Sequence, residues 1–203
     1  KGIVDEKDIS EGIEIIDCEG GYITPGFIDL HIHGYLGKDV CDATVESIKT
    51  IAGGLVENGV TGFLPTTMTV DMKVIKKALE VCRALKEESK TWEGSTILGV
   101  HAEGPFISAA KKGAQDPKYI LKPDAKFVKE YADIIRIISL APEEDENFEA
   151  IQEIRRDTDV IMSIGHTSAD YDTAMKSTEI GIMKSTASRT LTVRSSPRII
   201  ATR

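Results

Sequence analysis

Two histidines, His31 and His33, stand two positions apart at the end of an apolar run and carry the clearest chemical signal in the chain. On a β-strand, residues i and i+2 point to the same side, so both imidazoles can bind one cation. The chain has only four histidines, and these two are followed closely by Gly34 and Gly37. The alternative is a surface strand that carries two histidines by chance. We favour the metal site.

A second pair, His101 and Glu103, repeats this spacing with a carboxylate. A carboxylate withdrawn from water is costly unless it is paired or binds a metal, so Glu103 is a candidate ligand that could bridge two ions. The alternative is an acid paired with Lys111 or Lys112. We expect His101 to be an outer partner that orients Glu103 or a substrate group.

The fourth histidine, His166, follows Gly165 at the end of another apolar run. Taken without the other candidates, a histidine at this position is more often an ordinary loop residue than a metal ligand. Together with His31, His33 and Glu103 it completes a set of three nitrogens and one carboxylate, which suits zinc or ferrous iron. Such a site keeps a position open for water and polarises a carbonyl, which predicts hydrolysis of an amide or a similar bond.

Short apolar runs alternate with helical patterns and must position these side chains. This alternation predicts a parallel sheet built from βα units. The runs show no polar alternation, so we expect strands buried on both faces. They cover residues 26–32, 60–65, 96–100, 134–140 and 160–164. Most of the candidate side chains follow such runs, at the carboxyl ends of the strands, where parallel sheets place functional groups.

Apolar residues at helical spacing predict five helices between these runs. They cover residues 45–55, 71–85, 123–131, 148–154 and 168–179. Asp71 and Ser168 are the expected N-terminal caps of the second and fifth helices, and Gly59 is the expected C-terminal stop of the first.

Composition limits the classes of partner. The chain has 203 residues, with 33 acidic against 25 basic side chains and a formal charge of −8, which argues against binding to nucleic acid or to an anionic membrane. Three widely separated cysteines indicate no disulfide framework and fit a reduced cytoplasm. No apolar stretch approaches the roughly 20 residues that span a membrane. A first residue other than methionine suggests that the chain starts inside a longer protein.

Five strings, PGFIDLHIHG, GVTGFLPTT, HAEGPF, KKGAQDP and GHTSADY, occur in this order. In order and spacing they resemble the N-acetylglucosamine-6-phosphate deacetylases of the amidohydrolase superfamily, over about residues 12–180. The resemblance implies an α/β fold: a partial (β/α)8 TIM-type barrel of about five βα units over residues 25–180, with a remnant of a small N-terminal β-sandwich over residues 1–24. It also implies metal-dependent hydrolysis of N-acetylglucosamine 6-phosphate to glucosamine 6-phosphate and acetate, in amino-sugar breakdown.

The resemblance implies a site for one or two ions of zinc or iron. The ligands that it assigns are His31, His33, Glu103 and His166. Some members lack the first histidine pair. The resemblance assigns substrate binding to Ala114 and Gln115. Ala114 matches a position that contacts the substrate through its backbone, and Gln115 stands where the family usually has a histidine. A glutamine can donate and accept hydrogen bonds but cannot act as an acid. The implied partners are a small amino-sugar phosphate and, in the full-length family, a second copy of the chain.

Several parts of the family pattern are not found. They are the aspartate that acts as general base after the last barrel strand, a ligand histidine in a Thr-His-Leu-Phe-Asn-Ala-Met-like motif, and the asparagine, arginine and later histidine that hold the sugar phosphate. Residues 181–203 instead form a basic tail off the pattern, with four arginines. One interpretation is a tail that binds a partner. Another is a reading-frame error, because residues 187–191 can be encoded so that a shifted frame reads Ile-Thr-His-Leu.

Two alternatives to the deacetylase stay open. One is another metal-dependent amidohydrolase, dihydroorotase-like or adenine-deaminase-like. The other is a non-catalytic remnant, since five strands leave a barrel of eight open and its edge strands exposed. Under the second alternative, the fragment itself is inactive or poorly folded.

Overall fold

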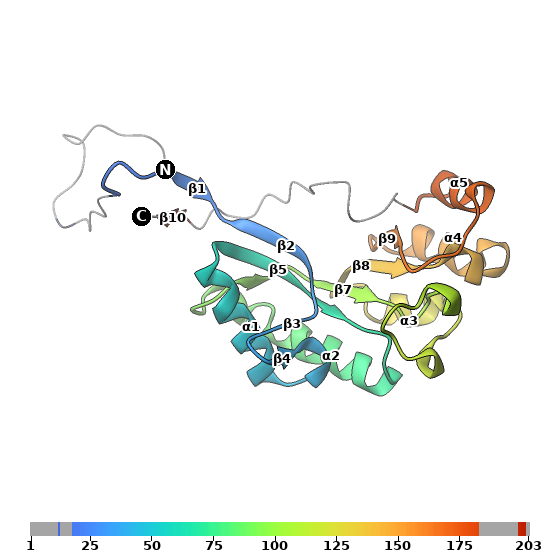
Figure 1. The fold of residues 1–203 in the computed structure, drawn as a ribbon, viewed down its shortest axis with the longest axis horizontal. Coiled ribbons are helices and arrows are strands. Elements are labelled where there is room, and N and C mark those ends of the chain that lie inside the picture. The colour runs from blue at the N-terminus through green and yellow to red at the C-terminus, as the bar shows by residue number, and fades with distance from the viewer. Residues whose placement is uncertain (1–11, 13–17, 183–198, 202–203) are drawn as a thin grey trace.

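The computed structural model describes residues 12, 18–182 and 199–201 (Figure 1). The strands are β1 (Ile23–Pro25), β2 (Phe27–Ile32), β3 (Gly34–Tyr35), β4 (Lys38–Asp39), β5 (Val60–Thr67), β6 (Thr96–Ile97), β7 (Val100–Glu103), β8 (Ile135–Leu140), β9 (Ile161–Ile164) and β10 (Ile199–Ala201). The helices are α1 (Val45–Glu57), α2 (Met72–Leu85), α3 (Ala125–Glu130), α4 (Glu149–Asp157) and α5 (Tyr171–Glu179). None of the helices in the described part of the chain has the length and apolar character needed to cross a bilayer.

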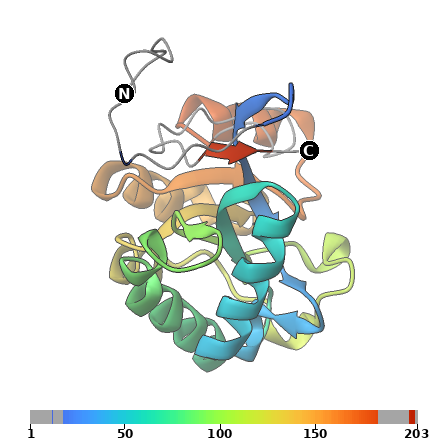
Figure 2. The same ribbon diagram turned by 90° about the vertical axis from the view of Figure 1, so that its left-hand side faces the viewer.

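Five strands form a curled parallel sheet in the order β2-β5-β7-β8-β9, and β6 adds a short pairing to β5. Helices connect the successive strands from β2 to β9, with α1 and α2 side by side on one face (Figure 2). This arrangement is a partial TIM-type barrel, as the sequence predicts. Because all five strands are parallel, their carboxyl ends lie at one edge of the sheet.

Two strand predictions need correction. The run 96–100 is not one strand, because the chain turns at Gly99, where φ is +148°, and separates β6 from β7. The first strand, β2, is not buried on both faces: its residues are exposed or half-buried, and Phe27 is 70% exposed. The reason is its place at the edge of the described sheet, with β5 as its only partner there. β5 and β8 lie inside the sheet and are almost wholly buried.

The helices begin close to the predicted positions. Asp71 caps α2 by accepting a hydrogen bond from the Lys73 backbone amide, and Gly59 follows α1 with a φ of +77° that ends the helix. The prediction that Ser168 caps the fifth helix is wrong. Asp170 caps α5 by accepting from the Thr173 backbone amide, whereas the Ser168 backbone amide is bound elsewhere.

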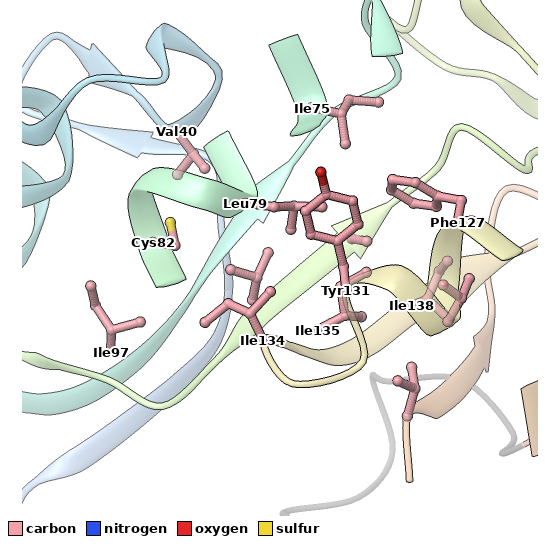
Figure 3. Close-up of a cluster of buried hydrophobic side chains, with 14 of the residues drawn as sticks. Val40, Ile75, Leu79, Cys82, Ile97, Phe127, Tyr131, Ile134, Ile135 and Ile138 are labelled. Atoms are coloured by element: carbon pink, nitrogen blue, oxygen red, sulfur yellow. The ribbon is translucent and has the colours of Figure 1, made fainter. Parts of the chain in front are cut away.

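The helices bury their apolar stripes against one face of the sheet in a single core. Figure 3 shows side chains from α2, α3 and β8 gathered there, among them Leu79, Phe127 and Ile138. Leu79 and Ile138 are fully buried. Phe127 packs edge-to-face against Phe106, with 6.0 Å between the ring centroids. This core fixes the sheet whose carboxyl-terminal edge carries the candidate site.

A separate two-stranded sheet forms where β1 pairs antiparallel with β10, with Thr24 opposite Ile200. Most of the predicted sandwich remnant, residues 1–11 and 13–17, lies outside the described residues. The same holds for residues 183–198 and 202–203 of the predicted basic tail, so the frame-shift interpretation stays a prediction.

We expect Leu79→Ala to lower the free energy of unfolding by about 2–5 kcal/mol, because it empties a fully buried site in the core. Leu121→Ala is the matched control, since Leu121 is 44% exposed and should change stability by no more than about 0.5 kcal/mol. Urea denaturation followed by circular dichroism measures both. Equal losses in the two variants would contradict the assignment of the core.

Candidate metal centre

The carboxyl end of β2 places the two histidines of the HxH pair together. The Nε2 atoms of His31 and His33 lie 3.2 Å apart, so the two imidazoles do point to the same side. The backbone is held at this point: the His31 amide donates to Asp29 Oδ1 at 2.9 Å, and the Ile32 amide donates to Thr66 Oγ1 on β5 at 2.9 Å.

Glu103, the last residue of β7, faces this pair across the sheet edge. Its Oε2 atom lies 3.2 Å from His33 Nε2, and its Oε1 atom lies 3.5 Å from His31 Nε2. One ligand atom from each of the three residues falls within 4.8 Å of the others, a spacing that could hold a metal ion. The alternative of a lysine partner fails among the described residues, where the ion pairs of Glu103 are all with histidines.

The loop after β9 brings in His166. Its Nε2 atom lies 3.3 Å from Glu103 Oε1. The residue has a φ of +48°, a left-handed conformation that is uncommon outside glycine and that surrounding contacts must hold. Thus residues separated by 135 positions along the chain meet at one carboxylate.

Backbone carbonyls set the direction of two of the imidazoles. His33 Nδ1 lies 3.2 Å from the Thr66 carbonyl oxygen, and His166 Nδ1 lies 2.8 Å from the Lys111 carbonyl oxygen. Because a carbonyl only accepts, each Nδ1 must carry the proton that it donates. Nε2 is then the atom that faces Glu103, and an Nδ1 atom bound to a backbone carbonyl is the usual arrangement of a metal-binding histidine.

Electrostatics favour an ionised carboxylate in this group. Burial raises the pKa of Glu103, but the hydrogen bond from His33 and the neighbouring imidazole charges outweigh it and bring the pKa to about 2. The hydrogen bond to Glu103 raises the pKa of His33, whereas burial lowers the pKa of His31. The site therefore offers a charged oxygen donor among nitrogen donors, a set that suits zinc or ferrous iron.

His101 lies beneath the pair as a neutral ring. It is fully buried, and burial lowers its pKa to about 4. Its Nδ1 donates to the Leu30 carbonyl at 3.0 Å and lies 3.3 Å from His31 Nδ1, while its Nε2 lies 2.8 Å from Ser139 Oγ. His101 thus contacts His31, whereas the sequence led us to expect contact with Glu103 or a substrate group.

The loop that carries KKGAQDP passes beside the site. Ala114 is exposed. Gln115 is only 3% exposed, and its amide is hydrogen-bonded to Glu103 Oε2 at 3.2 Å and to the Thr69 backbone amide. The carbonyl of Lys111 in the same loop holds His166.

Glu143, in the short 3-10 helix Pro142–Glu144 after β8, holds the loop that follows His166. Its carboxylate accepts from Thr167 Oγ1 and from both the backbone amide and the hydroxyl of Ser168. Sequence reasoning missed this residue. The available signal was its position, since an acid directly after a buried strand stands at the same sheet edge as the other site residues.

The chain is similar to known proteins over most of its described part. The sequence profile of the amidohydrolase family matches residues 22–194. The chain is 40% identical over 153 residues to the N-acetylglucosamine-6-phosphate deacetylase of Bacillus subtilis. The alignment covers 73% of this chain and 38% of that protein. With the deacetylase of Lysinibacillus sphaericus it shares 33% identity over 181 residues, 87% of this chain and 46% of that protein.

Solved structures agree with these sequence matches. The crystal structure of N-acetylglucosamine-6-phosphate deacetylase from Pasteurella multocida superposes with a TM-score of 0.77 at 32% identity, covering 89% of this chain and 47% of that one. The same enzyme from Thermotoga maritima gives a TM-score of 0.70 at 32% identity, over 85% and 45% of the two chains. The chain thus spans less than half the length of each of these four proteins.

We expect Glu143→Ala to release the loop after His166, because the Ser168 amide loses a charged acceptor. Loss of such a hydrogen bond costs about 1.5–3 kcal/mol, so the Ser168 amide should exchange its hydrogen at least about tenfold faster. Hydrogen exchange followed by NMR measures this rate. Glu144→Ala, at the neighbouring position, is the control, and equal exchange rates in the two variants would refute the assigned role.

Proposed function

The chain belongs to the amidohydrolase family, and from this premise we propose that it binds a divalent metal and hydrolyses N-acetylglucosamine 6-phosphate to glucosamine 6-phosphate and acetate. The observation that carries the proposal is the convergence of His31, His33 and Glu103 at the carboxyl-terminal edge of a partial barrel. The substrate comes from the relatives, which are named as deacetylases of this sugar phosphate.

The donor set fits a divalent metal. We propose that one or two ions, zinc or iron, are held by His31, His33, Glu103 and His166. Two of the imidazoles have their Nδ1 protons bound to backbone carbonyls, which leaves each Nε2 atom facing the shared carboxylate. Glu103 stays ionised because its pKa is about 2. A bound ion would polarise a substrate carbonyl and acidify a water molecule.

The chain's own residues supply position rather than proton transfer in this proposal. The neutral His101 ring packs beneath His31, with 4.9 Å between the ring centroids, and restricts its rotation. The backbone of Ala114, an exposed residue, is the proposed contact with the substrate, since it lies in the loop that also holds His166 through the Lys111 carbonyl. Gln115 adds a neutral amide in the same loop, which can orient a group but cannot act as an acid.

Activity is tested with the purified chain loaded with Zn²⁺ or Fe²⁺. We expect acetate release from N-acetylglucosamine 6-phosphate, lost when a chelator removes the metal and restored when the metal returns. Dihydroorotate and adenine serve as competing substrates. Hydrolysis of either one, or a metal-loaded chain that turns over none of the three, would overturn the proposal, and the last outcome would favour a non-catalytic remnant.

We expect Glu103→Gln to weaken binding of Zn²⁺ by about 100-fold or more, because the shared carboxylate loses its charge while keeping its size. Substitution of a residue that only supports a metal ligand already lowers metal affinity by about 10–100-fold. Competition with a chromogenic chelator measures the affinity. Glu93→Gln is the control, since Glu93 is exposed and precedes β6, at the opposite edge of the sheet. Unchanged affinity in Glu103→Gln would remove this residue from the ligand set.

A further inference from the structure

The Gln115 side chain connects two strand ends that are far apart in the sequence. Its Oε1 atom accepts from the backbone amide of Thr69, which follows β5, and its Nε2 atom donates to Glu103 Oε2, on β7, at 3.2 Å. The side chain is 3% exposed, so neither bond is open to competition from bulk water. One amide therefore joins the loop after β5 to the carboxylate at the centre of the site.

The orientation of this amide is fixed by its partners. A backbone amide only donates, so the Gln115 oxygen must face Thr69. The Gln115 NH₂ group must then face Glu103, whose ionised carboxylate only accepts. The two bonds need an acceptor and a donor at the two positions of one planar group, and glutamine supplies both without a net charge.

The surroundings leave little room for another arrangement. Thr69 is 1% exposed and packs against Gly104, the residue after Glu103. A Cβ atom built on Gly104 would lie 2.1 Å from Thr69 Oγ1, and Gly104 has a φ of +80°. The loop after β5 thus lies directly against the end of β7, and Gln115 is hydrogen-bonded to both segments.

The two oxygens of Glu103 face different partners. Oε2 receives the Gln115 donor and lies 3.2 Å from His33 Nε2, while Oε1 faces His31 and His166 at 3.5 and 3.3 Å. Without the Gln115 bond, the carboxylate would lose the one hydrogen bond that ties it to a side chain outside the histidine group among the described residues. Its rotation about the terminal torsion is otherwise broad.

We propose that Gln115 is a positioning residue that holds the Glu103 carboxylate in its observed orientation toward the histidines, and that it does so through the Thr69 amide rather than by touching substrate. This inference rests on the proposed metal site. It assigns the residue to the support of a ligand, which is distinct from the substrate contact implied by the family resemblance.

The test compares Gln115→Met, which keeps the length of the side chain and loses both hydrogen bonds, with Gln115→His, whose neutral ring can accept at one nitrogen and donate at the other. Zn²⁺ affinity, measured by competition with a chromogenic chelator, should fall about 10–100-fold in Gln115→Met. In Gln115→His it should stay within a few-fold of the original chain. Gln152→Met, at an exposed position on α4, controls for the loss of a glutamine.

A second measurement does not depend on the metal. Exchange of the Thr69 amide hydrogen in the metal-free chain should be at least about tenfold faster in Gln115→Met than in Gln152→Met, because its acceptor is lost. An unchanged Thr69 rate, or a Zn²⁺ affinity equal to that of the original chain, would overturn the positioning role. A rise in KM alone, at saturating metal, would also overturn it and indicate substrate contact.

The two measurements separate this inference from the proposed function. If the original chain binds no divalent ion, the proposed metal site fails, even where the Thr69 amide still depends on Gln115. If the original chain binds Zn²⁺ and Gln115→Met binds it equally well, the metal site stands and the positioning role is wrong.

Discussion

The half-buried carboxylate of Glu103 is the constraint around which the site is organised. A charge withdrawn from water must be compensated, and here three imidazoles and one amide supply the compensation. These groups come from the end of β2, the loop after β9 and the loop that contains Gln115. Each of these three segments must reach the same point at the carboxyl-terminal edge of the sheet. The position of Glu103 at the end of β7 therefore restricts the conformation of all three segments.

Parallel strands explain why the sequence could predict this meeting point. The i, i+2 spacing of His31 and His33 fixes their common side on a strand, and the βα alternation places the end of every strand at one edge. Glu103 and His166 follow predicted strands, so their proximity to the histidine pair follows from topology alone. The structure brings these four residues together, as shown by the contacts of Glu103.

Features that depend on contacts between loops could not be predicted in this way. Ser168 has the residue type of a helix cap, but its backbone amide is bound to Glu143, a residue 25 positions away, and Asp170 caps the helix instead. The burial of β2 also depends on neighbours: an apolar run predicts two covered faces, whereas an edge strand with one partner has less cover. Local periodicity contains no information about either partner.

The four candidate ligands are held by two different kinds of structure. His31, His33 and Glu103 lie at or beside strand ends, where the ladder to β5 and the core beneath it resist local opening. His166 instead lies in a loop with a left-handed backbone, held by the Lys111 carbonyl, the Ser108 amide and the contacts of Glu143 with the residues that follow. Opening of that loop would remove one nitrogen donor and leave the other three groups in place. Structural support for the site is therefore uneven: the sheet fixes the carboxylate and the histidine pair, and hydrogen bonds between loops decide whether the fourth donor is present.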